Sequence, residues 1–282
     1  MSLLDIGTLK GYLRGCIMPE DEYKYTSGSS QFEIIYSISK QYPHKTKHVV
    51  YNKPYLIPDR NSKLQTGNKK ENHKKRSSEF QIVDRSLRRA KSEIQDIVLC
   101  NKFDMFATFT FNGKKENSKK FGYTVHNRQD PSELKKVMSN WLKSQQKIHG
   151  KFDYIIVPEY HKDGKSIHFH ALFNGYSGIL SDSGLKDKGQ IIWNVSGYRA
   201  GHSTIKMIRQ TSDDIGRLGS YVTKYITKDM PLFAGKKRYW CSRGFDRPIK
   251  EHNFPIPPLD LFTNVYETEF YTIYEFPNLG HK

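Results

Sequence analysis

The alternation of apolar and polar positions predicts strands in the middle of the chain. Residues 106–111 are aromatic or β-branched apart from one alanine, and Asn112-Gly113 follows as a turn signal. Residues 154–160 and 167–174 have the same character, and a turn-type sequence at residues 161–166 separates them. Because so short a connection joins antiparallel neighbours, these two strands are predicted to form a hairpin. Shorter strands are predicted at residues 191–195 and 237–241.

Three segments follow a helical period instead. Residues 79–100 combine an apolar face with several arginines, and residues 213–228 carry a second apolar stripe. The third helix follows Asp130, an N-cap residue with Pro131 in the first turn and Glu133 in a capping-box-like position, and Gly150 ends it. Its predicted buried stripe is Leu134, Val137, Trp141, Leu142 and Ile148. Together these elements predict an α+β fold, in which helices pack on one face of a central antiparallel sheet.

The first part of the chain lacks a sustained period. Prolines at 43, 54 and 58 and a charged run at residues 68–76 predict an extended or mobile basic arm over residues 1–77. A solvated tail and a DNA-contacting arm both fit that run. We therefore divide the chain into this arm, a body over residues 78–250 that begins with a basic helix, and a C-terminal extension over residues 251–282 without an assigned role.

The charge of the chain indicates a polyanionic partner. Lys and Arg number 46 against 29 for Asp and Glu, which gives a formal net charge of +17. Nucleic acid and an acidic membrane surface are the two candidates. No apolar run has the length of a bilayer span and none reads as a signal peptide, so nucleic acid is favoured and membrane is not. The three cysteines are scattered and fit reduced thiols of a cytoplasmic protein.

The predicted hairpin creates a candidate metal site. His168 and His170 are two residues apart on one strand, so their side chains point to the same face. If the turn is centred on Asp163 and Gly164, Glu159 lies directly opposite His168 and shares that face. Two imidazoles and a carboxylate suit a divalent metal with open positions, here Mg²⁺ or Mn²⁺. Alternating histidines can also be plain surface residues of a sheet.

A candidate nucleophile follows in residues 213–228. At helical pitch Tyr221, Tyr225, Lys224 and Lys228 occupy one band of roughly 100° beside the apolar stripe. Two amphipathic tyrosines bordering a core are the alternative. As a nucleophile, a phenolate would attack a phosphate whose charge the metal neutralises and form a 5′-phosphotyrosine. A neighbouring lysine could stabilise the phenolate or the pentavalent phosphate.

The combined motifs resemble those of rolling-circle replication initiators (Rep proteins) of the HUH endonuclease superfamily. Residues 106–112 resemble the first, structural motif, and His168-Phe169-His170 is similar to the His-hydrophobic-His motif. Glu159 resembles a third ligand found in some members. Residues 221–228 resemble the two-tyrosine motif of microvirus initiators, and residues 237–244 resemble the segment that follows it in phage and plasmid relatives.

The resemblance implies an HUH/RRM-like fold and a specific activity. The expected protein nicks single-stranded DNA at a replication origin, with alternating use of the two tyrosines and with host helicase and polymerase as partners in a bacterial cytoplasm. No phosphate-binding Gly-x-x-x-x-Gly-Lys-Ser/Thr motif indicates an attached helicase. The alternatives are a single-strand transposase or relaxase of the same superfamily, a viral packaging protein, and a non-catalytic nucleic-acid-binding protein.

Overall fold

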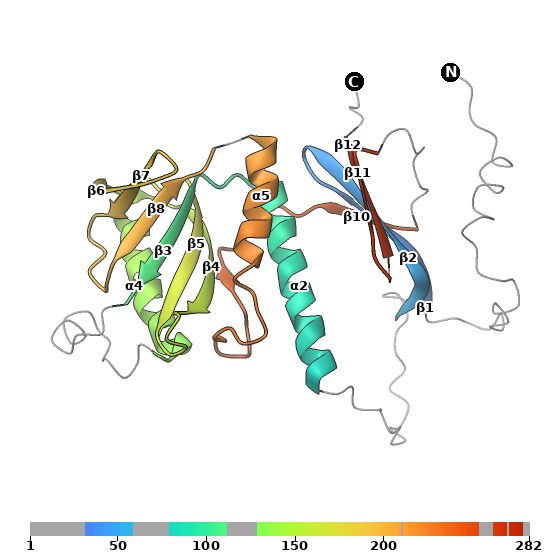
Figure 1. Ribbon diagram of the computed structural model, residues 1–282, viewed down its shortest axis with the longest axis horizontal. Helices are drawn as coiled ribbons and strands as arrows, with labels where there is room; N and C mark the ends of the chain where they lie inside the picture. The colour runs from blue at the N-terminus through green and yellow to red at the C-terminus, as the bar shows by residue number, and fades with distance from the viewer. Residues whose placement is uncertain are drawn as a thin grey trace, which may run out of the picture.

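The computed structural model describes residues 32–58, 79–111, 129–209, 211–253, 262–269 and 271–278. The predicted α+β class is confirmed, because the described residues form two antiparallel sheets and three helices (Figure 1). The helices are α2 (Glu79–Cys100), α4 (Pro131–His149) and α5 (Ser212–Thr223).

The larger sheet has seven strands in the order β6-β7-β8-β3-β5-β4-β9. Their bounds are β3 (Met105–Thr110), β4 (Asp153–Tyr160), β5 (Ile167–Asn174), β6 (Leu180–Asp187), β7 (Gln190–Val195), β8 (Ser203–Met207) and β9 (Trp240–Cys241). The predicted hairpin is confirmed as β4 and β5, which lie next to β3 at the centre of the sheet. Strands β6 and β8 were not predicted from the sequence pattern, and β9 is shorter than predicted.

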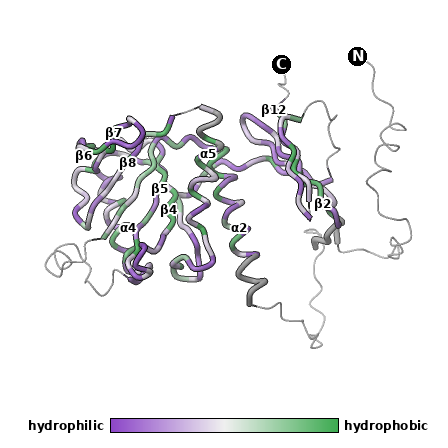
Figure 2. Tube along the Cα trace, in the orientation of Figure 1, coloured by the Kyte–Doolittle hydropathy of each residue, from purple (hydrophilic) through white to green (hydrophobic). Residues whose placement is uncertain are grey.

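The helices cover both faces of this sheet, which corrects the expectation that they lie on one. On one face, Phe169 and Phe173 of β5 pack with Leu134 and Met138 of α4. On the other, Leu172 belongs to a second core that α2 and α5 cover. The second core consists of Ala90, Ile94, Ile97, Val98, Phe103, Phe106, Ile155, Val157, Leu172, Leu218, Val222, Tyr225, Ile226 and Met230. Figure 2 shows the hydrophobic residues along β4 and β5, the strands that both layers cover.

Helix α4 begins and ends where the sequence predicts. Asp130 is its N-cap and accepts a hydrogen bond from the Ser132 backbone N–H at 2.8 Å. Gly150 ends it with a φ of 87°, a conformation that glycine adopts without a Cβ clash. The predicted stripe is wrong at Ile148, which is exposed, and Met138 and Gln145 are buried in addition to Leu134 and Leu142.

A second sheet joins strands from near both ends of the chain. Its order is β10-β1-β2-β12-β11. The bounds are β1 (Phe32–Gln41), β2 (Lys45–Pro58), β10 (Ile249–His252), β11 (Asn264–Glu267) and β12 (Tyr271–Pro277). The expectation of an irregular arm is therefore wrong for residues 32–58. The charged run at residues 68–76 lies outside the described residues, and the division of the chain at residues 77 and 250 stays a prediction.

Helix α2 connects the second sheet to the first. Its buried Asp96 accepts hydrogen bonds from Lys40 at 3.0 Å and from the Tyr42 hydroxyl at 2.6 Å, and it pairs with Lys250 at 3.3 Å. On its other side α2 shares the second core with α5. The second sheet, α2 and α5 thus form one continuous packing unit. Over the described residues, no helix combines the length and apolarity needed to cross a membrane.

Candidate active site

The β4–β5 hairpin brings three metal-binding side chains together. Glu159 pairs in register with His168, as the turn residues predict. The Glu159 Oε2 atom lies 2.7 Å from His168 Nε2 and 2.7 Å from His170 Nε2, and the two Nε2 atoms are 3.0 Å apart. One oxygen and two nitrogens therefore converge on a single point.

This donor set fits a divalent cation. Metal bonds of about 2.1 Å at right angles place neighbouring ligand atoms about 3 Å apart, close to the separations that the three residues already have. Two histidines and one carboxylate on one face of a metal leave its remaining positions open for water or substrate oxygens. Among the described residues, Glu159, His168 and His170 form such a cluster of potential ligands.

Neighbouring groups prepare two of the ligands for this role. The Thr108 hydroxyl on β3 lies 3.1 Å from His170 Nδ1, so a proton on Nδ1 leaves the Nε2 lone pair facing the cluster. Burial lowers the pKa of His170, which keeps its imidazole neutral, although Glu159 opposes this shift. Partial burial raises the pKa of Glu159, but hydrogen bonds from His170 and His168 outweigh it and hold this pKa below its ordinary value.

The segment with the two tyrosines differs from the predicted single helix over residues 213–228. Helix α5 ends at Thr223, and the chain continues as a turn in which Tyr225 N–H bonds to the Val222 carbonyl. The buried Arg238 donates to the Thr227 carbonyl at 2.7 Å and so supports the segment beyond the turn. Of the predicted band, Tyr221 alone lies in the helix, whereas Lys224 and Tyr225 lie in the turn and Lys228 follows it.

Both tyrosines nevertheless reach the histidines. The Tyr225 ring stacks on the His170 ring with centroids 3.7 Å apart, and it is 8 % exposed. Tyr221 is 39 % exposed and contacts Phe106 edge-on at 5.0 Å. The two phenol rings meet edge-on at 5.5 Å. Burial, and then a hydrogen bond with Tyr221, raises the pKa of Tyr225.

A lysine lies over both rings. The Lys224 Nζ atom is 3.8 Å from the Tyr221 ring centroid and 4.8 Å from that of Tyr225. A cation at this distance from two phenols favours their ionised forms. Lys228 is exposed, and no printed contact joins it to the tyrosines, so its placement adds nothing to its predicted role.

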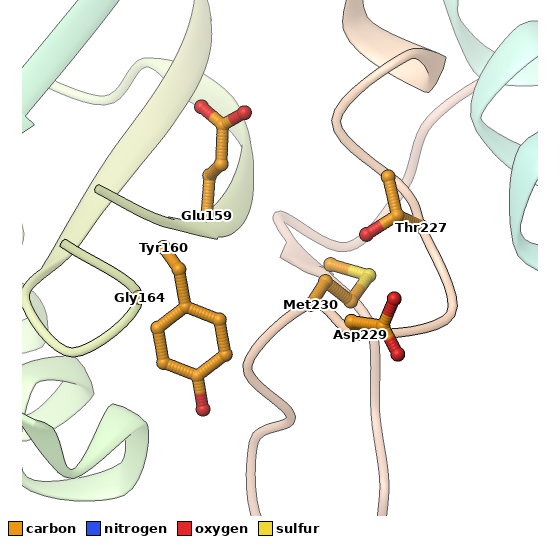
Figure 3. A pocket seen from close by; sticks show the side chains of 6 residues that line it. All are labelled: Glu159, Tyr160, Gly164, Thr227, Asp229 and Met230. Atoms are coloured by element: carbon orange, nitrogen blue, oxygen red, sulfur yellow. The ribbon is translucent and has the colours of Figure 1, made fainter. Parts of the chain in front are cut away.

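A pocket of about 420 Å³ opens beside the three ligands. Figure 3 shows it between the hairpin and the chain that follows α5. Its lining residues are Glu159, Tyr160, Gly164, Thr227, Asp229 and Met230. The sequence analysis did not identify Asp229 or Thr108. The Thr108 position could have been found from its strand, because β3 pairs it directly with His170.

Comparisons with known proteins give one match. Searches of curated proteins and of solved structures found no match. A family model that describes replication-associated proteins of the ORF2 type matches residues 104–230, from the start of β3 to the end of the segment that bears the tyrosines. The match contains all three candidate metal ligands and both tyrosines, and it supports placing this part of the chain in a replication-initiator family.

Proposed function

We propose that this protein is a metal-dependent endonuclease and strand transferase that nicks single-stranded DNA at a replication origin and begins rolling-circle replication. The observation that carries this proposal is the contact between a tyrosine ring and a candidate metal ligand, Tyr225 on His170 at 3.7 Å. A phenol and a set of ligand atoms in one site are the two parts that a phosphodiester transfer through tyrosine needs. The family match to replication-associated proteins supports the same conclusion.

Glu159, His168 and His170 would hold the metal. A bound Mg²⁺ or Mn²⁺ supplies charge neutralisation for the scissile phosphate and orients its oxygens. The protein must supply the nucleophile, its ionisation and the placement of the strand. In the proposed step the phenolic oxygen forms a bond to phosphorus, and the bond from phosphorus to the 3′ oxygen breaks. The phenol loses its proton to solvent, and the released 3′ oxygen gains one.

The two tyrosines have unequal environments. Tyr225 is buried and stacked, and its raised pKa makes its phenolate costly to form in the arrangement described. Tyr221 is partly exposed and has Lys224 closest to its ring. Accordingly we propose that Tyr221 reacts first and that Tyr225 acts in a later transfer. Lys224 would stabilise either phenolate, and Lys228 would contact the phosphate backbone.

A binding protein without catalysis explains the site less well. Such a protein needs basic and aromatic residues but has no need for an oxygen and two nitrogens converging within 3.0 Å. The Thr108 contact on the far side of His170 is a further arrangement typical of metal ligation. Unwinding and synthesis would then come from host helicase and polymerase.

One gel assay tests the proposal. The full chain is incubated with a labelled single-stranded oligonucleotide that contains the origin, with Mn²⁺ or with excess chelator. A denaturant-stable protein–DNA band is expected only with the metal, and the variant carrying both Tyr221→Phe and Tyr225→Phe should form none. Cleavage that is unchanged in excess chelator would rule out the metal, and cleavage by the double variant would rule out the tyrosines.

A further inference from the structure

The two faces of the five-stranded sheet differ in burial. Along β1, Ser37 and Ser39 are buried, whereas Tyr36, Ile38 and Lys40 on the alternate face are partly or largely exposed. The strand register extends this difference across the sheet, because Ser39 lies opposite the buried His48. One face thus belongs to a core, and the other is accessible.

The accessible face carries four tyrosines. In one row, Ile38, Val49, Ile273 and Tyr266 lie directly opposite one another on β1, β2, β12 and β11. In the next row, Tyr51 pairs with Tyr271, and their rings meet edge-on at 6.4 Å. Tyr36 is two residues from Ile38 on the same face. We call the set Tyr36, Ile38, Val49, Tyr51, Tyr266, Tyr271 and Ile273 the tyrosine face.

Two of these rings are unusually open for large side chains. Tyr36 is 48 % exposed and Tyr266 is 52 % exposed. An aromatic ring in this position leaves its flat surface available for stacking on another planar group. The tyrosine face is therefore a ready platform for planar ligands rather than part of a packed core.

Arginines of α2 lie toward the same side. Lys40, on the tyrosine-face side of β1, donates to both Ser92 and Asp96 of α2 at 3.0 Å. Arg85 and Arg89 lie within about 40° of this contact stripe on the helix, one to three turns toward its N-terminus. Figure 1 shows the β1–β2 hairpin end of the sheet nearest the C-terminal end of α2. The basic half of the helix thus extends along the side of the sheet that bears the tyrosines.

The carboxylates on this side are already neutralised. Asp96 pairs with Lys40 and Lys250. Glu275, which lies in the row beyond Ile273, pairs with Lys45 at 3.0 Å and with Lys47 at 2.8 Å. A phosphate backbone approaching the tyrosine face would therefore meet the arginines of α2 without an opposing buried negative charge.

We propose that the tyrosine face and the α2 arginines bind single-stranded DNA at a surface separate from the candidate active site. Stacked tyrosines would take the bases and the arginines the phosphates, the combination by which proteins bind single strands without sequence preference. Duplex DNA does not fit, because its bases are stacked on one another and not available to the rings. This surface goes beyond the proposed nicking activity, since none of its residues belongs to the metal or tyrosine cluster.

The test measures binding of a labelled oligothymidylate to the full chain by fluorescence anisotropy in excess chelator. Tyr36→Ala and Tyr266→Ala should each weaken binding about fivefold or more, the lower end of a lost stacking contact. Tyr36→Phe and Tyr266→Phe keep the rings and should bind like the unaltered protein. Both tyrosines are exposed, so the alanine variants should fold, and circular dichroism checks this. Duplex of the same length should bind all variants equally.

Arginine substitution and cleavage provide independent readouts. Arg85→Gln should lower the slope of log affinity against log salt by about one. Cleavage of a short origin oligonucleotide that fills only the active site should proceed at the same rate in the alanine variants. Equal single-strand affinity of the alanine and phenylalanine variants would overturn the proposed surface. Absence of cleavage in every protein would count against the nicking proposal alone, because the binding assay contains no metal.

Discussion

Replacing Thr108 with valine should weaken metal binding at the candidate active site. The substitution keeps the branched shape and removes the hydroxyl that lies 3.1 Å from His170 Nδ1. Without this contact the imidazole is no longer fixed in the orientation and tautomer that direct Nε2 toward Glu159 and His168. The expected effect falls on the affinity for the metal and not on the fold, since Thr108 is only partly buried in a strand between two others.

Two magnitudes bound the effect. A single hydrogen bond contributes about 0.5–1.5 kcal/mol, which corresponds to about 2- to 13-fold in a binding constant. Loss of a partner behind a ligating histidine typically costs about 10- to 100-fold in metal affinity. The two ranges overlap near tenfold, which is the expected increase in the Mn²⁺ concentration that gives half-maximal effect.

Calorimetric titration with Mn²⁺ and cleavage rates over a Mn²⁺ series measure this shift. Thr108→Ser retains the hydroxyl and should titrate close to the unaltered protein. Saturating Mn²⁺ should restore most of the cleavage rate of Thr108→Val, because the defect lies in metal binding. An unchanged midpoint in Thr108→Val would refute the supporting role of the hydroxyl. A rate that stays low at saturating metal with a normal midpoint would place the role of Thr108 elsewhere.

Three further predictions concern the site and the second sheet. His170→Ala should abolish cleavage but keep most of the salt-sensitive DNA binding in a filter assay, because lysines and arginines dominate that binding; parallel loss of both would contradict this. Tyr221→Phe should prevent the first covalent adduct, and Tyr225→Phe should form it but fail in repeated rounds; the reverse pattern would exchange their roles. Burial lowers the pKa of His48 to about 4, so its contribution is complete above its ordinary pKa of about 6.5 and is lost as pH falls toward 4, by about 3 kcal/mol in all. Urea unfolding at pH 7 and pH 4 should show a smaller acid loss in His48→Gln than in the unaltered protein, and equal losses would disprove the assignment.

The sequence predicts the metal cluster because its geometry is local. The turn at Asp163 and Gly164 sets the hairpin register, and the register alone places Glu159 opposite His168. Two-residue spacing then places His170 on the same face. The same locality explains the success at helix α4, whose ends depend on Asp130 and Gly150.

Other features depend on distant contacts that no local pattern contains. Strands β1 and β2 gain their partners from the other end of the chain, as in the Lys45–Glu275 ion pair. The end of α5 was misplaced because Ile226 continues the helical period, although its side chain is buried by the turn rather than by a helix. Helices on both faces followed from Leu172, which lies on the histidine side of β5 and still belongs to a core.

Mapping the covalent adduct tests the central claim most directly. The protein is allowed to react with an origin oligonucleotide and Mn²⁺, digested with nuclease and protease, and analysed by tandem mass spectrometry. The account predicts a nucleotide 5′-linked to Tyr221 or Tyr225, present with metal and absent with chelator. An adduct on any other residue, or an adduct that forms equally in chelator, would contradict it.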